Sequence, residues 1–428
     1  MIIDGRRRFM LFLGDLVLLA LVGIAIRTGL APNLGWGKLA VSLAVFPPVF
    51  YITGLYERKD LPFDGHYLAQ AATAGAITFG ALAVIFYWVP PLALPRRLPL
   101  VEIVAVLAAL PFYRKVSGHV IGRVNGPVRL IIHGSGPAAE ALEAAIREHG
   151  DYVVEEPDAP FRGGGNGRNG APAVVADVSN GAYAGDSSEL LGLARQGYHV
   201  VDMVNVYERA TGRLPTEHLS PQWLLSELQP IRGPAFQRIR RVTDVLGALV
   251  LLAVLGIPTF RLGVLLWLED RGPILYKQRR VGLDEREFTV YKLRTMRVGA
   301  DSDGPLWTVA DDHRVTRVGR IARWLRLDEV PQLLNVLKGD MSLVGPRPEA
   351  VGLVRQYEEA IPNYHLRHLV KPGVTGWAQV CFENTSSVDA VRKKLEYDLY
   401  YIRHMGPVFD LRIMLRTVAV VLSGKGSR

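Results

Sequence analysis

The stretch VTDVLGALVLLAVLGIPTFRLGVLLWLED, residues 242–270, decides the fold of the second half of the chain. Its apolar run ends at Ile257, which makes it shorter than the roughly 20 residues that a helix needs to cross a bilayer. Pro258 then removes a helical hydrogen bond, and Arg261 would be costly inside the hydrocarbon region. We therefore predict a helix that enters the membrane, kinks at Pro258 and returns to the same face. An ordinary span or an amphipathic surface helix is the alternative.

The composition indicates a basic membrane protein. Hydrophobic residues make up 49% of the 428 residues, the mean hydropathy is +0.16 and the net charge is +9. The apolar content indicates a membrane portion, and the positive charge suits phosphates, nucleotides or anionic lipid head groups rather than nucleic acid. The single cysteine, Cys381, excludes an intramolecular disulfide and a cysteine-based zinc site, which fits a catalytic part that faces the cytosol.

Four apolar segments occupy the first 120 residues, and most approach the length of a membrane span. They cover residues 9–26, 39–55, 67–89 and 100–112. With four spans, basic clusters at residues 6–8, 58–59 and 114–115 fall on one side, and the positive-inside rule makes that side cytoplasmic. Arg96-Arg97 falls on the opposite side and is an exception. We therefore predict four transmembrane helices over residues 1–120, with buried helices of a soluble protein as the alternative.

A Rossmann-like α/β domain is expected over residues 121–230. VRLIIHGSGPAAEAL is typical of a strand, a glycine turn and a helix, and both APAVVADVS and YHVVDMVNVYE favour further strands. The turn at residues 134–136 carries Ala139 where a third glycine would stand, and no acidic partner is evident on a following strand. We therefore predict a degenerate nucleotide-binding domain with a structural or regulatory role, and NAD binding is the alternative.

The segment after Gly272 is dense in lysine and arginine. EFTVYKLRTM is expected to form a strand with Lys292 and Arg294 on one face, and both are candidate substrate-binding residues. Arginines then recur at every third position from 314 to 326. On a helix they would form a basic stripe that faces lipid or substrate phosphates. A solvated face on a helix that packs through its apolar side is the alternative.

The acidic pair Asp328-Glu329 ends this arginine series. The plainer interpretation is a capped helix start, because Asp is a favoured N-cap and Pro331 is tolerated in a first turn. The helix dipole and the arginines would also hold Asp328 ionised, and an ionised aspartate can attack phosphorus. The oxygens of Glu329 suit Mg²⁺ that bridges phosphates.

Arg347 stands between Pro346 and Pro348. The two prolines restrict the backbone on both sides of the arginine. A guanidinium on such a backbone is a good fork for a phosphate or a nucleobase edge, and a plain turn is the alternative.

From about Arg240 to its end, the chain resembles the bacterial sugar transferases, which are polyprenyl-phosphate phosphoglycosyltransferases with one re-entrant membrane helix. The resemblance rests on four motifs in order: YKQRRVG, YKLRTM, DDHRVTRVGRIARWLRLDEVPQLLNVLKGDMSLVGPRPE and KPGVTGWAQV. The ending KLEYDLYYIRHMGPVFDLRIMLRTVAVVLSGKG is similar to the exopolysaccharide branch. The N-terminal layout is similar to the long form of these enzymes.

This resemblance implies a mixed, mainly α-helical catalytic domain at residues 235–428, which includes the re-entrant helix. It implies transfer of a sugar-1-phosphate from a nucleotide-diphosphate sugar, usually a UDP-sugar, to undecaprenyl phosphate with release of UMP. Such a reaction would start the assembly of an exopolysaccharide or another glycoconjugate. The protein would be a multi-pass protein of the bacterial inner membrane, with its catalytic domain in the cytoplasm and no nucleic-acid partner. A homodimer is left open.

Residue roles also follow from the resemblance. Asp328 matches the nucleophile that forms a covalent phosphosugar intermediate, and Glu329 matches its partner, which is associated with Mg²⁺. Arg347 matches the arginine that helps to bind the nucleotide, while Lys292 and Arg323 fall in motifs near the phosphates.

The chain departs from the family pattern at two places. Pro258 matches the proline that breaks the re-entrant helix, but Ile257 stands where the family often has serine, so a hydroxyl that could bond the backbone is lost. The usual Asn-Gly stretch after TGWAQV is replaced by CFENTSS, so the resemblance does not extend to the identity of the sugar.

The sequence disfavours two other functions. A membrane-tethered NAD-dependent sugar dehydratase would need a Tyr-x-x-x-Lys pair, but none of the 16 tyrosines has lysine four residues on. A non-catalytic scaffold that retains the fold is disfavoured by the intact Asp-Glu pair and the Pro-Arg-Pro motif.

Overall fold

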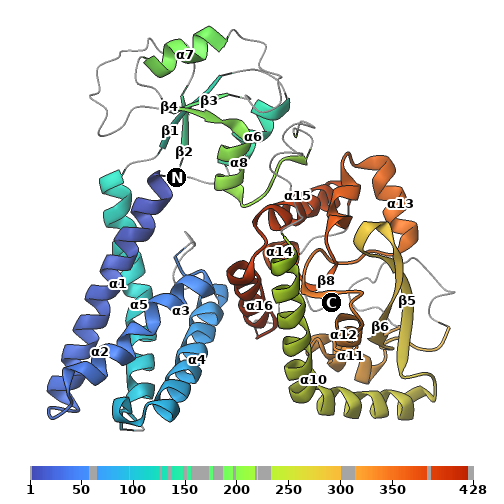
Figure 1. The fold of residues 1–428 in the computed structure, drawn as a ribbon, viewed down its shortest axis with the longest axis horizontal. Coiled ribbons are helices and arrows are strands. Elements are labelled where there is room, and N and C mark those ends of the chain that lie inside the picture. The colour runs from blue at the N-terminus through green and yellow to red at the C-terminus, as the bar shows by residue number, and fades with distance from the viewer. Residues whose placement is uncertain are drawn as a thin grey trace. The chain divides into compact units, whose positions relative to one another are not determined.

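The computed structural model describes residues 2–56, 65–95, 97–125, 128–133, 137–147, 152–155, 173–176, 187–195, 199–216, 219, 233–299, 314–382 and 387–422. These residues pack into two compact units. One unit contains the N-terminal helices as far as Gly126 together with the last helix, α16, and the other contains Pro127–Pro407. Figure 1 shows the elements of both units.

The first unit is entirely helical in its described residues. Its helices are α1 (Ile2–Gly29), α2 (Trp36–Ala44), α3 (Phe46–Thr53), α4 (Gly65–Trp88), η1 (Pro90–Leu92), α5 (Leu98–Asn125) and α16 (Pro407–Leu422). Leu39, Phe46, Phe50 and Leu110 lie in its apolar core, each at most 1% exposed. A buried ion pair of 2.8 Å joins Asp15 to Arg114 and connects α1 to α5.

Four helical segments of the described chain are long and apolar enough to cross a membrane. They are Phe9–Gly29, Trp36–Thr53, Gln70–Trp88 and the long helix α10 (Pro234–Asp270). The first three coincide with three of the predicted spans. The fourth predicted span, residues 100–112, lies inside α5 and is not among the four, since α5 also carries Glu102, Arg114 and Lys115.

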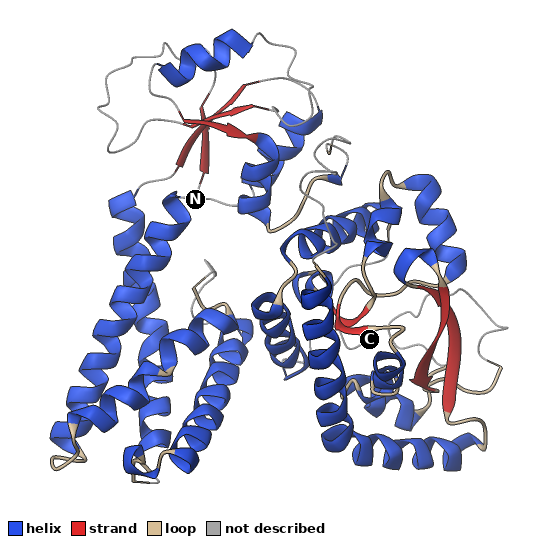
Figure 2. Cartoon of the chain, viewed as in Figure 1, coloured by secondary structure: helices blue, strands red, loops and turns tan. Residues whose placement is uncertain are grey.

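A parallel sheet of four strands forms one part of the second unit, as Figure 2 shows in red. Its strands are β1 (Val128–His133), β2 (Tyr152–Glu155), β3 (Ala173–Ala176) and β4 (His199–Asp202), in the order β2-β1-β3-β4. All pairs are parallel, as the sequence predicted for this segment. Its helices are α6 (Pro137–Arg147), α7 (Ser187–Arg195) and α8 (Met203–Thr211). The glycine turn at residues 134–136 lies outside the described residues.

The prediction that YHVVDMVNVYE is a strand is wrong for its second half. The strand β4 ends at Asp202, whose carboxylate accepts a hydrogen bond from the backbone N–H of Asn205 at 3.4 Å and caps helix α8. Met203, Val206 and Tyr207 then follow helical spacing and pack into the core beside the sheet. A side-chain cap together with burial outweighs the strand preference of the valines.

The remainder of the second unit begins with α10, which has 37 residues and bends along its length, as Figure 1 shows. Pro258 lies inside this helix, and a proline removes one backbone hydrogen bond and bends a helix. The hydroxyl of Thr259 donates to the carbonyl of Leu255 at 2.7 Å. A backbone-bonding hydroxyl, absent at Ile257, is therefore supplied two residues later by Thr259.

Helices predominate in the rest of this unit, in agreement with the mainly helical domain that was expected. The elements are β5 (Leu275–Val281), η3 (Leu283–Glu285), β6 (Glu287–Leu293), α11 (Arg317–Trp324), η4 (Leu327–Glu329), α12 (Gln332–Lys338), β7 (Ser342–Val344), α13 (Val351–Ala360), η5 (Tyr364–Leu369), β8 (Gly373–Thr375), α14 (Trp377–Cys381) and α15 (Val388–His404). Strands β5 and β6 form an antiparallel hairpin, and β7 pairs with β8 in parallel.

Candidate active site

The acidic pair lies in η4, a short 3-10 turn between α11 and α12. Arg326 adopts a left-handed backbone conformation with φ 57° and turns the chain after α11. Helix α12 starts only at Gln332, with Pro331 at its N-cap position and no side-chain cap. The prediction that Asp328 caps this helix is therefore wrong, because a separate 3-10 turn comes before the helix.

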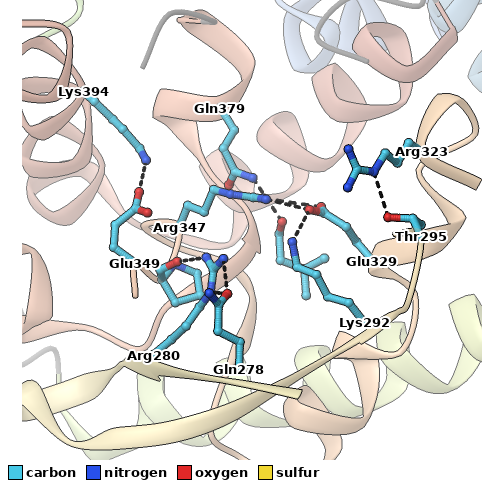
Figure 3. Close-up of polar contacts among 12 residues, drawn as sticks. Gln278, Arg280, Lys292, Thr295, Arg323, Glu329, Arg347, Glu349, Gln379 and Lys394 are labelled. Atoms are coloured by element: carbon cyan, nitrogen blue, oxygen red, sulfur yellow. Dashed lines mark hydrogen bonds and ion pairs between the residues drawn. The ribbon is translucent and has the colours of Figure 1, made fainter. Parts of the chain in front are cut away.

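Glu329 lies at the centre of an ionic cluster, which Figure 3 shows. Its Oε1 accepts hydrogen bonds from Lys292 Nζ at 3.1 Å and Arg347 Nη2 at 2.6 Å, and its Oε2 accepts from Arg347 Nη1 at 3.4 Å. The three side chains are largely buried. Burial by itself would raise the pKa of Glu329, but the charges of Arg347 and Lys292 outweigh it and hold that pKa well below its usual value. Glu329 is therefore the firmly ionised member of the pair.

Asp328 differs from its neighbour. Its Oδ1 is buried and has no hydrogen-bond partner among the described residues. Burial, and next the charge of Glu329, raise the pKa of Asp328 to about 6, although Lys292, Arg323 and Arg347 oppose the shift. The cations act on Asp328 in the expected direction, but loss of solvation outweighs their attraction and leaves the pKa above its ordinary value. Asp328 remains mostly ionised at neutral pH but close to its titration.

The loop that carries Arg347 is fixed by a second layer of charged side chains. Arg367 donates from Nη2 to the carbonyl of Arg347 at 2.9 Å and to the carboxylate of Asp398 at 2.8 Å. Arg280 donates to the carbonyl of Pro348. Arg367 and Asp398 are almost fully buried, with 2% and 1% of their side chains exposed. The orientation of Arg347 therefore depends on residues that are distant in the sequence, as well as on the two prolines.

No sequence pattern points to Arg367 or Asp398 as functional residues. They are 31 residues apart in the chain, and neither stands in a spacing that indicates chemistry by itself. Arg280 lies in the basic motif YKQRRVG, but the motif does not indicate that this arginine bonds the carbonyl of Pro348. Only the fold brings these groups to the carbonyls of the Pro-Arg-Pro loop.

Arg323 and Arg294 are placed differently from one another. Arg323 donates from Nε to the hydroxyl of Thr295 at 2.8 Å, and its charge acts on Asp328. The guanidinium of Arg294 is instead paired with Asp270 at 2.5 Å and donates to the carbonyl of Pro273 at 2.6 Å. Strand β6 ends before Arg294, so the expectation that it shares a face with Lys292 is not met. Arg294 fixes the end of α10 rather than joining the Glu329 cluster.

The arginine series does not form one continuous helix. Helix α11 spans eight residues and is capped by the hydroxyl of Thr316, so Arg314 precedes the helix and Arg326 turns away after it. Ile321 and Trp324 are exposed on α11, at 51% and 61%. The helix therefore presents exposed apolar side chains beside its arginines.

The donor set is compatible with one Mg²⁺. No group of three or more His, Cys, Asp or Glu side chains that could hold a metal gathers in the described part of the chain. Mg²⁺ does not require such a group, because it is commonly held by one or two carboxylates, with water and substrate phosphates completing the shell. The weakly engaged Oε2 of Glu329 would supply the protein ligand.

Comparison with known proteins identifies the family. A family model described as "Bacterial sugar transferase" matches residues 235–424, which include every residue of the Glu329 cluster. The undecaprenyl-phosphate glucose phosphotransferase of Komagataeibacter xylinus is 39% identical over 416 residues, which cover 87% of this chain and 74% of that protein. The chain belongs to the bacterial sugar transferase family. The resemblance seen in the motifs is thereby confirmed.

Other members of the family match shorter parts. The UDP-N-acetylgalactosamine-undecaprenyl-phosphate N-acetylgalactosaminephosphotransferase of Aeromonas hydrophila is 38% identical over 257 residues, which are 60% of each chain. The exopolysaccharide production protein PSS of Rhizobium leguminosarum bv. phaseoli is 41% identical over 195 residues, 44% of this chain and 98% of that protein. The chain thus spans 60% of the Aeromonas relative and 39% of the UDP-glucose:undecaprenyl-phosphate glucose-1-phosphate transferase of Escherichia coli.

Proposed function

We propose that this protein transfers a sugar-1-phosphate from a UDP-sugar to undecaprenyl phosphate, releases UMP and so starts the assembly of an exported polysaccharide. One structural observation carries the proposal: a buried carboxylate oxygen of Asp328, which has no hydrogen-bond partner among the described residues, adjoins the Lys292–Glu329–Arg347 cluster. The names of several relatives, which pair a sugar-phosphate transfer with undecaprenyl phosphate, support the choice of substrates.

In the first step, a carboxylate oxygen of Asp328 attacks the β-phosphorus of the UDP-sugar. The bond from that phosphorus to the bridging oxygen breaks, and UMP leaves with the oxygen and its electron pair. The product is a sugar-phosphate joined to Asp328 through an acyl phosphate bond. The cations of Lys292 and Arg347 are placed to neutralise the charge that develops on the phosphates.

In the second step, a phosphate oxygen of undecaprenyl phosphate attacks the same phosphorus. The bond between phosphorus and the Asp328 oxygen breaks, and the carboxylate is regenerated. The product is undecaprenyl diphosphate sugar. A carboxylate is a far better leaving group than an alkoxide, so an aspartyl intermediate suits transfer to a second phosphate.

Glu329 would hold Mg²⁺, which as a Lewis acid supplies further charge neutralisation at the phosphates. Glu329 has a second task that is independent of the metal. Its negative charge raises the pKa of Asp328 and, through hydrogen bonds, fixes the positions of Lys292 and Arg347. The two carboxylates therefore have different roles.

We infer that α10 enters the cytoplasmic face of the bilayer and returns to it. The helix exposes apolar side chains before and after Pro258, among them Val254 at 65% and Phe260 at 71%. Its bend would let Arg261 avoid the middle of the hydrocarbon region. The exposed Trp324 of α11 is suited to the membrane interface. In this orientation, a soluble nucleotide-sugar and a lipid phosphate can both reach Asp328.

The test is UMP release by the purified full-length protein, with Mg²⁺, undecaprenyl phosphate and a panel of UDP-sugars. Asp328→Asn should abolish release. Asp389→Asn, which changes an aspartate whose side chain is 86% exposed on α15, is the matched control and should retain it. Incubation of the wild type with UDP-sugar alone should add one sugar-phosphate to the peptide that contains Asp328, as read by mass spectrometry. Normal turnover by Asp328→Asn would exclude the covalent role.

A further inference from the structure

A turn that lies outside residues 235–424, the segment that the family model matches, contacts Trp377 in the motif KPGVTGWAQV. This turn, Thr211-Gly212-Arg213, follows helix α8 of the parallel α/β part. The carbonyl of Gly212 accepts a hydrogen bond from the indole Nε1 of Trp377 at 3.1 Å. Gly212 has a φ of 66°, a conformation that favours glycine and lets its carbonyl face the indole. On its other side, the Trp377 ring stacks on Tyr400, with centroids 5.9 Å apart.

Glu396 of helix α15 fixes the same turn. Its carboxylate accepts a hydrogen bond from Arg213 Nη1 at 3.2 Å and another from the Tyr207 hydroxyl at 2.9 Å. The backbone carbonyl of Glu396 accepts from the N–H of Leu214 at 3.1 Å. Arg213 and Glu396 are mostly buried, so this pair is little screened by solvent. The turn is therefore hydrogen bonded to both α14 and α15.

The residues that precede Trp377 in the chain connect it to the Pro-Arg-Pro loop through backbone contacts. Gly376 comes directly before Trp377, and a Cβ added there would lie 2.2 Å from the carbonyl oxygen of Gly345. The N–H of Gly345 donates to the carbonyl of Thr375 at 2.8 Å, and the N–H of Gly373 donates to the carbonyl of Pro346 at 2.9 Å. The next residue along that loop is Arg347, which bonds Glu329.

We propose that the turn Thr211-Gly212-Arg213 is a positioning element of the active site, and that Arg213 is a positioning residue for Arg347. The segment 373–377 lies between this turn and the Pro-Arg-Pro loop, and it contacts both through directional hydrogen bonds. A displacement of Trp377 should therefore also displace Arg347, because the backbone at Gly376 lies in tight contact with Gly345. This inference assigns a catalytic-domain task to residues outside 235–424, and its kinetic part rests on the proposed function.

Hydrogen–deuterium exchange on the full-length protein tests the positioning independently of activity. Arg213→Ala should increase exchange in peptides that cover residues 342–350 and 371–381, since loss of a distant support raises local opening. Tyr207→Phe removes one hydrogen bond to Glu396 without a change in ring packing, and it should increase exchange in the same peptides by less. Arg209→Ala, which removes an exposed arginine from the same helix, is the control and should change neither peptide.

Exchange that increases only around α8 would overturn the inference, because the turn would then support its own domain alone. If Arg213→Ala does not fold, Tyr207→Phe decides the same question.

UMP release adds a kinetic readout: Arg213→Ala should lower kcat/KM for the UDP-sugar by about tenfold, mainly through KM, and Arg213→Lys should recover part of it. Unchanged kcat/KM in Arg213→Ala would also overturn the inference. Absence of UMP release by the wild type would refute the proposed function instead, while the exchange result still decides the positioning.

Discussion

Acidification should stop the first chemical step by protonating Asp328. A protonated carboxyl is not a nucleophile, and the pKa of Asp328 is raised to about 6 by burial and the charge of Glu329. Glu329 stays ionised over the same range, because its pKa is held well below the usual value. The rate should therefore be near its maximum above neutral pH, fall to half near pH 6, and drop about tenfold for each further unit of acidification.

A variant separates this titration from general acid damage. Lys292 is the largest of the influences that lower the pKa of Asp328. Lys292→Met keeps most of the side-chain volume but removes the charge, so the midpoint should rise by about one unit, at the low end of what a close opposite charge produces. In free energy this is about 1.4 kcal/mol between the two protonation states.

The assay is single-turnover UMP release by rapid quench at constant ionic strength, without undecaprenyl phosphate, so that only the first step is observed. The wild type and Lys292→Met are each followed from about pH 5 to about pH 8, the range around the midpoint of a carboxyl with a raised pKa. A flat wild-type profile, or a midpoint that moves to lower pH in Lys292→Met, would refute the reasoning about burial and charge at Asp328.

Three further predictions follow from the contacts. Arg347→Lys loses the two-nitrogen contact with Glu329, so kcat/KM for the UDP-sugar should fall roughly thirtyfold, equivalent to about 2 kcal/mol, in a UMP-release assay. Arg367→Ala leaves the carboxylate of Asp398 buried without its cation and should cost about 3–5 kcal/mol, seen as a lower Tm; an unchanged Tm would contradict the buried pair. Thr259→Val removes the hydroxyl bonded to the Leu255 carbonyl, and should destabilise the bend of α10 by about 1 kcal/mol in denaturant unfolding, whereas Thr259→Ser should not.

Local sequence patterns allowed much of the fold to be predicted. The apolar runs near residues 9–26 and 67–89 became helices, and the strands before residues 134 and 177 were correctly located, because hydropathy and β-branched residues act over a few positions. The strand β2 was missed. The second half of YHVVDMVNVYE was assigned to a strand because its valines favour one, and the Asp202 cap was overlooked.

The candidate site was only partly predictable. Asp328, Glu329, Arg347 and Lys292 were selected from motifs, and the structure brings them together around Glu329. Arg294 was selected on the same grounds, but it pairs with Asp270. An alternating pattern in the sequence predicts which face of a strand a residue occupies. It does not predict where the strand ends or which side chain lies opposite that residue.

The sequence by itself determined that this is a membrane-associated, basic chain with the ordered motifs of a sugar transferase, because composition, proline effects and motif order are properties of the chain alone. Only the tertiary structure decided that burial raises the pKa of Asp328, that Arg367 and Asp398 fix the Arg347 loop, and that Gly212 contacts Trp377 across 165 residues. The physical reason is common to all three. Burial and long-range contacts exist only after segments distant in the chain have packed together, and no local pattern encodes the dielectric or the partners that this packing creates.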